Sequence, residues 1–66
     1  MVTNSPPSRD KLGVGLKVQI IQKQDQPTGN LTEGKIKQIL TSSNIHPHGI
    51  KVKLSSGEIG RVQTIV

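Results

Sequence analysis

The side chains with the most evident chemistry stand together in Ile45-His46-Pro47-His48-Gly49, which contains both histidines of the chain. His46 and His48 are two residues apart, so in an extended backbone their rings project to the same side. Pro47 favours this geometry because it restricts the preceding residue to extended or polyproline conformations. Imidazole rings placed in this way can contact a ligand or hydrogen-bond within their own loop. The stretch therefore predicts either a ligand-facing pair of histidines or a loop that the histidines anchor, and both alternatives stay open.

A second set of candidate side chains consists of bases that alternate with aliphatic residues. In Ile50-Lys51-Val52-Lys53-Leu54 the aliphatic residues occupy one face of an extended segment and the lysines occupy the other. Lys35 and Lys37 flank Ile36 in the same manner. If these two segments pair in a sheet, four lysines share one outer surface, where like charges facing each other cost about 0.2–1 kcal/mol. The predicted nucleic-acid contacts are Lys17, Lys35, Lys37, Lys51, Lys53, Arg61, His46 and His48.

The placement of charge along the chain indicates an anionic partner. Nine bases and four acids give a net charge of +5. The acids stand in the N-terminal tail, in a turn or beside a glycine at a strand start: Asp10, Asp25, Glu33 and Glu58. Such segregation produces a positive field that attracts polyanions. The alternative is that the lysines only keep a small protein soluble and protect strand edges from association.

Catalysis and cofactor binding are not expected. The chain has no cysteine, and only Asp25, Glu33 and Glu58 could join the histidines in a zinc site, which needs three or four protein ligands. No set of nucleophile, base and acid is present, and a small barrel offers little concave volume for a substrate. The glycines match no phosphate-binding fingerprint and are better explained by turns and bulges. The sequence therefore predicts no metal, no cofactor, no small-molecule substrate and no enzymatic activity.

The elements that position these side chains are expected to be short strands. Apolar and polar residues alternate with a period of two, and no segment shows the helical period. The expected strands are Leu16–Ile20, Glu33–Thr41, Gly49–Leu54 and one or two strands within Ile59–Val66. A slip in the apolar spacing between Ile36 and Ile39 predicts a β-bulge near Lys37-Gln38. Turns are expected at Gln26–Gly29, where glycine accepts a positive φ, and at Ser55–Glu58.

The core is expected to be thin because the chain of 66 residues has no aromatic residue, no alanine and no cysteine. Its apolar residues are isoleucine, leucine and valine with one methionine, and β-branched side chains favour strands. The predicted inward residues are Leu16, Val18, Ile20, Ile36, Ile39, Ile50, Val52, Leu54 and Val62. Short antiparallel strands with tight turns predict an all-β, SH3-like barrel of four to five strands over residues 12–66. Residues 1–11, which are polar and contain Pro6-Pro7, are expected to form a disordered arm.

Two resemblances support this fold. The spacing of glycine and aliphatic residues is similar to the KOW motif of ribosomal and transcription-elongation proteins: Gly15-x-x-Val18-x-Ile20 followed by Gly29-x-Leu31-x-x-Gly34-x-Ile36-x-x-Ile39. A wider set of blocks, spread over residues 12–66, resembles the YwbE family of small bacterial proteins. These blocks are Lys23-x-Asp25-Gln26-x-Thr28-Gly29-x-Leu31-Thr32-x-Gly34, Ile39-Leu40-Thr41, His46-Pro47-His48-Gly49-Ile50-Lys51-Val52-x-Leu54 and Gly57-x-x-Gly60-Arg61-Val62. The resemblance implies the small KOW-like barrel, and it brings no established activity with it.

The function expected from these residues is that of a nucleic-acid-binding module. RNA is favoured over DNA as the partner. A structured or ribonucleoprotein form is expected because no aromatic side chain is present to stack on unpaired bases, so recognition should be of shape and charge. The alternative is a protein-interaction module that binds an acidic or extended partner segment. No apolar run approaches the roughly 20 residues that span a bilayer, and the first ten residues lack the apolar region of a signal peptide. A cytoplasmic location without membrane contact is therefore expected.

Overall fold

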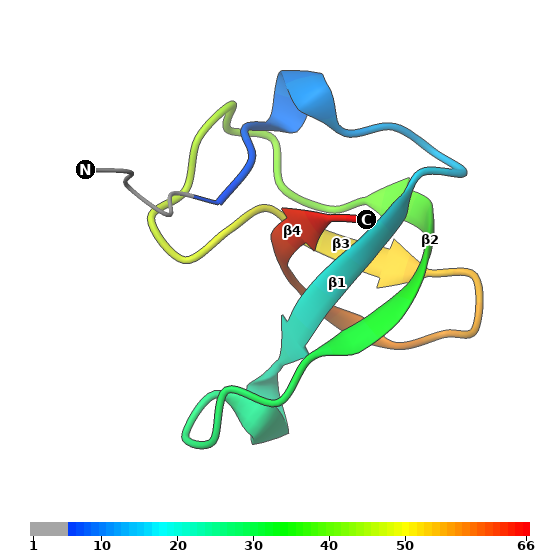
Figure 1. The fold of residues 1–66 in the computed structure, drawn as a ribbon. Coiled ribbons are helices and arrows are strands. Elements are labelled where there is room, and N and C mark those ends of the chain that lie inside the picture. The colour runs from blue at the N-terminus through cyan, green and yellow to red at the C-terminus, as the bar shows by residue number, and fades with distance from the viewer. Residues whose placement is uncertain (1–5) are drawn as a thin grey trace.

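Four antiparallel strands close into a small barrel in the computed structural model, which describes residues 6–66 (Figure 1). The strands are β1 (Lys17–Gln22), β2 (Thr32–Ile39), β3 (Lys51–Leu54) and β4 (Ile59–Ile65). Each strand pairs with the next, and β4 pairs back onto β1. The predicted all-β barrel is confirmed, with four strands rather than five.

Helical structure in the described residues is limited to two 3₁₀ turns, η1 (Arg9–Lys11) and η2 (Lys23–Asp25). No helix among residues 6–66 has the length and apolar character needed to cross a membrane. The η2 turn continues directly from β1 and was not expected from the sequence, which gave that segment no regular structure.

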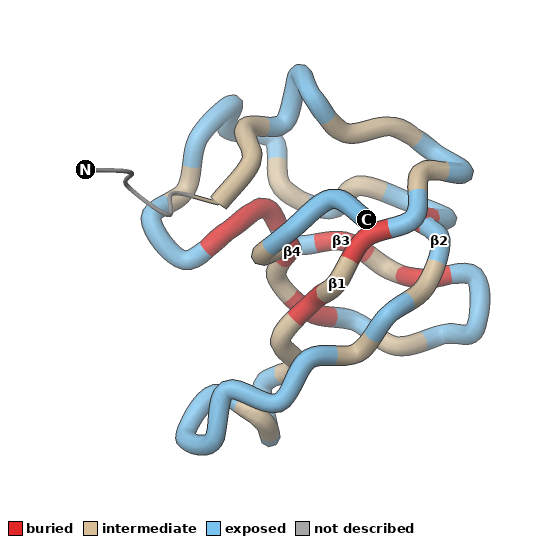
Figure 2. Tube along the Cα trace, in the orientation of Figure 1, coloured by how far each residue is buried: buried red, intermediate tan, exposed pale blue. Residues whose placement is uncertain are grey.

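The core consists of seven aliphatic side chains that are almost completely inaccessible to solvent. They are Val18, Ile20, Ile36, Ile50, Val52, Leu54 and Val62, all of them among the nine predicted inward residues. The other two, Leu16 and Ile39, are half-buried and pack against this cluster. Buried and more exposed positions alternate along the strands, while most positions of the loops are exposed (Figure 2). The alternation of aliphatic and polar residues thus gives the inner and outer faces of the barrel.

Two glycines occupy inward positions of the barrel wall. A Cβ atom at Gly60 would lie 2.5 Å from the carbonyl oxygen of Ile21 and 2.9 Å from Cδ1 of Ile20. A Cβ atom at Gly34 would lie 2.8 Å from Cδ1 of Leu54. Gly60 is paired with neighbours on both sides, in β1 and in β3. The missing side chains leave the space that Ile20 and Leu54 fill in a barrel of this small diameter.

Two register shifts bend the strands. One falls between Ile36 and Gln38 where β2 pairs with β3, which confirms the predicted bulge. The other falls where β1 pairs with β4: Gln19 faces Thr64 and the next residue of β1 faces Val62. Gln63 is therefore the extra residue of β4. This second irregularity was not expected, although the apolar spacing from Val62 to Ile65 is an odd step like the one from Ile36 to Ile39. Bulges of this kind redirect side chains and increase the local twist of a strand.

The turns agree with the glycine pattern, with small shifts of boundary. Gly29 and Gly57 have φ angles of 74° and 102°, as expected for the two tight turns. The first turn begins one residue earlier than predicted, because the Gly29 N–H donates to the carbonyl oxygen of Asp25 at 2.7 Å. β3 begins at Lys51 rather than Gly49, because Gly49 has a φ of 101° and cannot continue an extended strand.

The predicted N-terminal arm lies only partly within the described residues, since residues 1–5 are outside them. Residues 6–11 comprise an irregular segment and η1. The backbone N–H of Arg9 donates to the carbonyl oxygen of Asn44 at 2.7 Å, which ties this segment to the loop that carries the histidines. The boundary of the arm at residue 11 stays a prediction.

The inward glycines give a graded stability test. We expect Gly60→Ala to lower the free energy of unfolding by about 1–3 kcal/mol, because its Cβ would meet backbone that cannot move independently. Gly34→Ala should cost less, since the Leu54 side chain can rotate away. Gly13→Ala is the control: its Cβ would meet no atom within 4 Å, so the change should stay within about 0.5 kcal/mol. Denaturant titration followed by far-ultraviolet circular dichroism measures all three, and equal effects would contradict the packing argument.

Candidate nucleic-acid interface

The basic side chains of the strands lie on the outer face of the barrel, and the register decides which of them meet. Lys17 of β1 is directly opposite Lys35 of β2. Lys51 of β3 is directly opposite Arg61 of β4. Both are pairs of like charge, which is unfavourable across an antiparallel ladder unless other charges compensate. In the first pair Lys17 finds such a charge, because its Nζ lies 2.9 Å from a carboxylate oxygen of Glu33.

The pairing of β2 with β3 creates the shared surface on which the four-lysine prediction depends. Lys53 lies opposite Gln38, and Lys37 is the extra residue of the bulge beside it. Lys35, Lys37 and Lys51 are exposed, while Lys53 is half-buried. We call these four residues, Lys35, Lys37, Lys51 and Lys53, the lysine face. Their role as ligand contacts stays a prediction.

Lys17 and Arg61 flank the lysine face on opposite sides, on β1 and β4. These two strands also pair with each other, but the two bases do not meet there. Arg61 faces Ile21, and the carbonyl oxygen of Lys17 accepts from the N–H of Val66. Lys17 and Ile21, the residue that Arg61 faces, are four positions apart along β1, a separation of about 13 Å. The positive surface therefore follows β2 and β3 around the barrel and does not form a continuous ring.

The two histidines differ in their surroundings. Nδ1 of His46 accepts a hydrogen bond from the backbone N–H of His48 at 3.1 Å. The ring centroids are 5.8 Å apart and the ring planes are tilted by 48°. His46 is half-buried and His48 is exposed. Partial burial, together with the positive charges of Arg61 and His48, lowers the pKa of His46. His46 thus maintains the turn of the loop in its neutral form.

Side chains of β4 anchor the main chain of this loop. Gln63 Nε2 donates to the carbonyl oxygen of His48 at 2.9 Å and to that of Arg61 at 3.2 Å. The Arg61 guanidinium donates through one Nη to the carbonyl oxygen of Gly49 at 3.1 Å. Gly49 must be a glycine here, since a Cβ atom would lie 2.3 Å from the carbonyl oxygen of Val62. Much of the anchoring is therefore done by residues outside the loop, and the His48 side chain is left on the surface.

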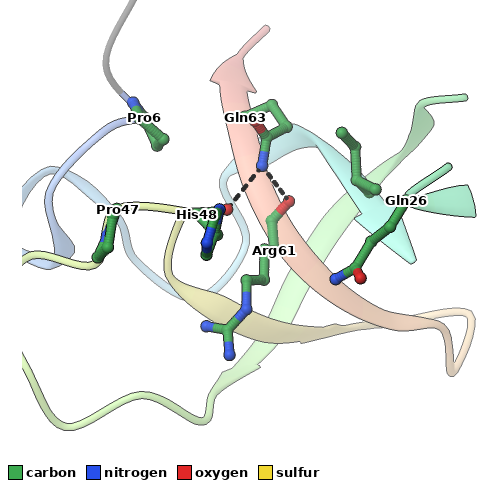
Figure 3. Close-up of a pocket in the computed structure, with 7 residues that line it drawn as sticks. Pro6, Gln26, Pro47, His48, Arg61 and Gln63 are labelled. Carbon is green, nitrogen blue, oxygen red and sulfur yellow. Dashed lines mark hydrogen bonds between the residues drawn. The ribbon is translucent and has the colours of Figure 1, made fainter. Parts of the chain in front are cut away.

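A groove opens between the histidine loop and β4. Its volume is about 370 Å³, and its lining residues are Pro6, Ile21, Gln26, Pro47, His48, Arg61 and Gln63. In Figure 3, Arg61 and Gln63 stand between His48 on one side and Gln26 on the other. Two predicted site residues, His48 and Arg61, line this groove, while His46 lies outside it. The sequence placed Gln26 only in a turn and did not single out Gln63; the one signal for Gln63 is its position two residues after Arg61 in an alternating strand.

Residues 6–66 contain no group of three or more His, Asp or Glu side chains placed to hold a metal ion. Asp10 and Glu58 instead accept hydrogen bonds from neighbouring serines, Ser8 and Ser56. The bond from Ser56 contributes most to a lowered pKa of Glu58. These carboxylates are thus engaged within their own turns.

Comparisons with known proteins assign the chain to a family. A family model described as "Uncharacterized conserved protein (DUF2196)" matches residues 5–65. The chain belongs to the DUF2196 family. It is 59% identical over 58 residues to "Uncharacterized protein YwbE" of Bacillus subtilis (strain 168), a match covering 88% of this chain and 89% of that relative. The resemblance to the YwbE family is therefore confirmed. No solved structure matches the chain.

The hydrogen bond at Nδ1 of His46 predicts how the stability of this DUF2196 member depends on pH. A pKa lowered by folding means that the unfolded chain binds the proton more tightly. The free energy of unfolding should then be highest above the ordinary pKa and fall as pH decreases from about 7.5 to about 5.5. His46→Asn should flatten this dependence, because the Asn Oδ1 can accept the same hydrogen bond without titrating.

His48→Asn is the comparison variant: it keeps the hydrogen bond to His46 and removes only the smallest of the three causes that lower the pKa of His46, so it should flatten the dependence less than His46→Asn does. Thermal unfolding followed by circular dichroism at several pH values measures all three proteins. Equal pH dependence in wild type and His46→Asn would contradict the proposed role of His46.

Proposed function

We propose that the chain is a non-catalytic RNA-binding module that holds structured RNA, free or in a ribonucleoprotein, through the lysine face and the adjoining Arg61. The observation that carries this proposal is the absence of compensating charge. Among the described residues, only Lys17 has a carboxylate at ion-pair distance, from Glu33. The four lysines of the face therefore have none, although they share the outer surface of two paired strands and Lys37 and Lys53 adjoin the same bulge. Phosphate groups would supply the missing negative charge.

The mode of binding follows from the composition. Modules that bind single strands stack bases on aromatic side chains, and this chain contains no Phe, Tyr or Trp. Lysine side chains contact phosphates as flexible point charges with little base discrimination. Recognition by charge and shape, with contacts to phosphate and 2′-hydroxyl groups, is the mode typical of double-stranded RNA. We therefore infer structured RNA as the partner and low sequence specificity.

The rival function is binding of an acidic or extended protein segment. Addition of a partner strand requires an unpaired strand edge. Every strand of the barrel is paired on both sides, so this form of the rival has little support in the fold. An acidic protein surface is the remaining form. Recovery of partners from cell extract, with and without ribonuclease, distinguishes this form of the rival from RNA binding. A protein partner that is still recovered after digestion supports the rival.

The lysine face can be tested with variants matched in charge. The β3 variant, Lys51→Gln/Lys53→Gln, removes two positive charges from the lysine face. The control variant, Lys11→Gln/Lys23→Gln, removes two positive charges from the 3₁₀ turns, outside the barrel strands. We expect the β3 variant to bind unrelated RNA hairpins more weakly, by similar factors for each hairpin. For this variant the slope of log affinity against log salt concentration should become shallower by about 0.7–0.9 for each lost phosphate contact.

The variant in the 3₁₀ turns should retain most of the affinity and the salt dependence of the wild type. Fluorescence anisotropy with labelled hairpins measures both quantities, and circular dichroism checks that the variants are folded. Equal losses in the two variants would mean that net charge alone is responsible. An unchanged affinity in the β3 variant would remove the lysine face from the mechanism.

A further inference from the structure

The lining of the groove between the histidine loop and β4 is positively charged. Arg61 is its only residue with a full charge at neutral pH, and none of its seven lining residues is acidic. Lys51 is directly opposite Arg61 across the ladder and adds to the positive potential beside the groove. A concave site with charge of one sign concentrates ligands of the opposite sign. The lining therefore selects an anionic group.

The guanidinium of Arg61 is already held in position. One of its N–H groups donates to the carbonyl oxygen of Gly49, and an arginine has five such donors, so most of them remain available. A planar guanidinium matches the geometry of a phosphate through two parallel hydrogen bonds. The bond to Gly49 reduces the side-chain freedom that would be lost when a ligand binds.

The rest of the groove suits a body that is flat and partly apolar. Pro6, Ile21 and Pro47 supply apolar surface, and the exposed imidazole of His48 supplies a planar ring. Gln26 and Gln63 place side-chain amides in the same lining. Amides donate and accept hydrogen bonds, as the edges of nucleobases do. A volume of about 370 Å³ is near the lower end of the range for small-molecule sites, which suits one nucleotide and not a longer segment.

We propose that this groove binds a single phosphorylated nucleoside, with Arg61 at the phosphate and the apolar residues and amides around the base. The inference rests on the proposed RNA-binding function and deepens it. An unpaired nucleotide, at the end or in a bulge of a structured RNA, would enter the groove beside the lysine face. A free mononucleotide has the same chemistry, and the experiment distinguishes the two sources.

The test uses the full chain labelled with ¹⁵N and titrated with adenosine 5′-monophosphate, with adenosine, and with RNA hairpins that contain or lack a one-nucleotide bulge. Adenosine 5′-monophosphate should shift the side-chain amide signals of Gln26 and Gln63 and the Nε signal of Arg61. Adenosine should shift them far less, because it lacks the phosphate. The bulged hairpin should shift the same signals, and the fully paired hairpin should leave them near their free positions.

Two variants with the same change of charge provide the control. Gln26→Glu places a carboxylate in the groove, and we expect about fivefold weaker binding of the monophosphate, the magnitude of one repulsive contact in water. Gln24→Glu adds the same charge two residues away, at an exposed position of η2 outside the groove, and should leave the affinity nearly unchanged. Equal effects of the two variants, or shifts confined to other residues, would overturn the groove as a nucleotide site.

The outcomes also separate this inference from the function on which it rests. Hairpins that bind with a lysine-dependent salt response while the groove signals stay unmoved would leave the proposed function intact and refute the nucleotide site. Binding of the monophosphate without binding of any RNA would identify the free nucleotide as the source and refute RNA binding. If the chain binds neither the RNA hairpins nor the monophosphate, both proposals are refuted.

Discussion

Closure of the sheet between β1 and β4 is the constraint on which the rest of this structure depends. A barrel of four short strands has a narrow interior, and this chain has only aliphatic side chains with which to fill it. Isoleucine, leucine and valine are small enough for that space, provided that some inward positions carry no side chain at all. Gly34 and Gly60 meet this requirement at the points where Leu54 and Ile20 project inward. The lack of aromatic residues and the presence of inward glycines thus have one physical cause.

The same closure places the residues of the candidate site. It brings β4 beside η2 and the histidine loop, which lie far from one another along the chain. The bulge at Gln63 directs that side chain to the loop carbonyl of His48, and Arg61 reaches the carbonyl of Gly49. The loop is therefore attached to a rigid strand, and its exposed imidazole faces a groove of fixed shape. Side chains held on rigid elements lose less freedom when a ligand binds.

Two regions of different chemistry follow from this arrangement. The lysine face on β2 and β3 offers flexible point charges, which suit a phosphate backbone of any sequence. The groove beside β4 offers an oriented guanidinium, amides and apolar surface, which suit one unit of defined shape. Lys51 and Arg61, directly opposite each other, join the two regions. A chain without aromatic residues would in this way combine general attraction to RNA with a contact to a single nucleotide.

The sequence by itself determined the strands, the glycine turns, the bulge in β2 and the core, because these depend on alternation and on residue preferences over a few neighbouring positions. It also identified His48 and Arg61 as candidate residues from their chemistry. Only the tertiary structure decided that Arg61 meets Gly49, that His46 bonds within its own turn, and that Gln26 and Gln63 share a groove with them. Those contacts join segments distant in sequence, and they are set by the register between β1 and β4. The extra residue of that register leaves one trace in the hydrophobic pattern, the step of three from Val62 to Ile65, and that step does not say which residues of β1 it lies against.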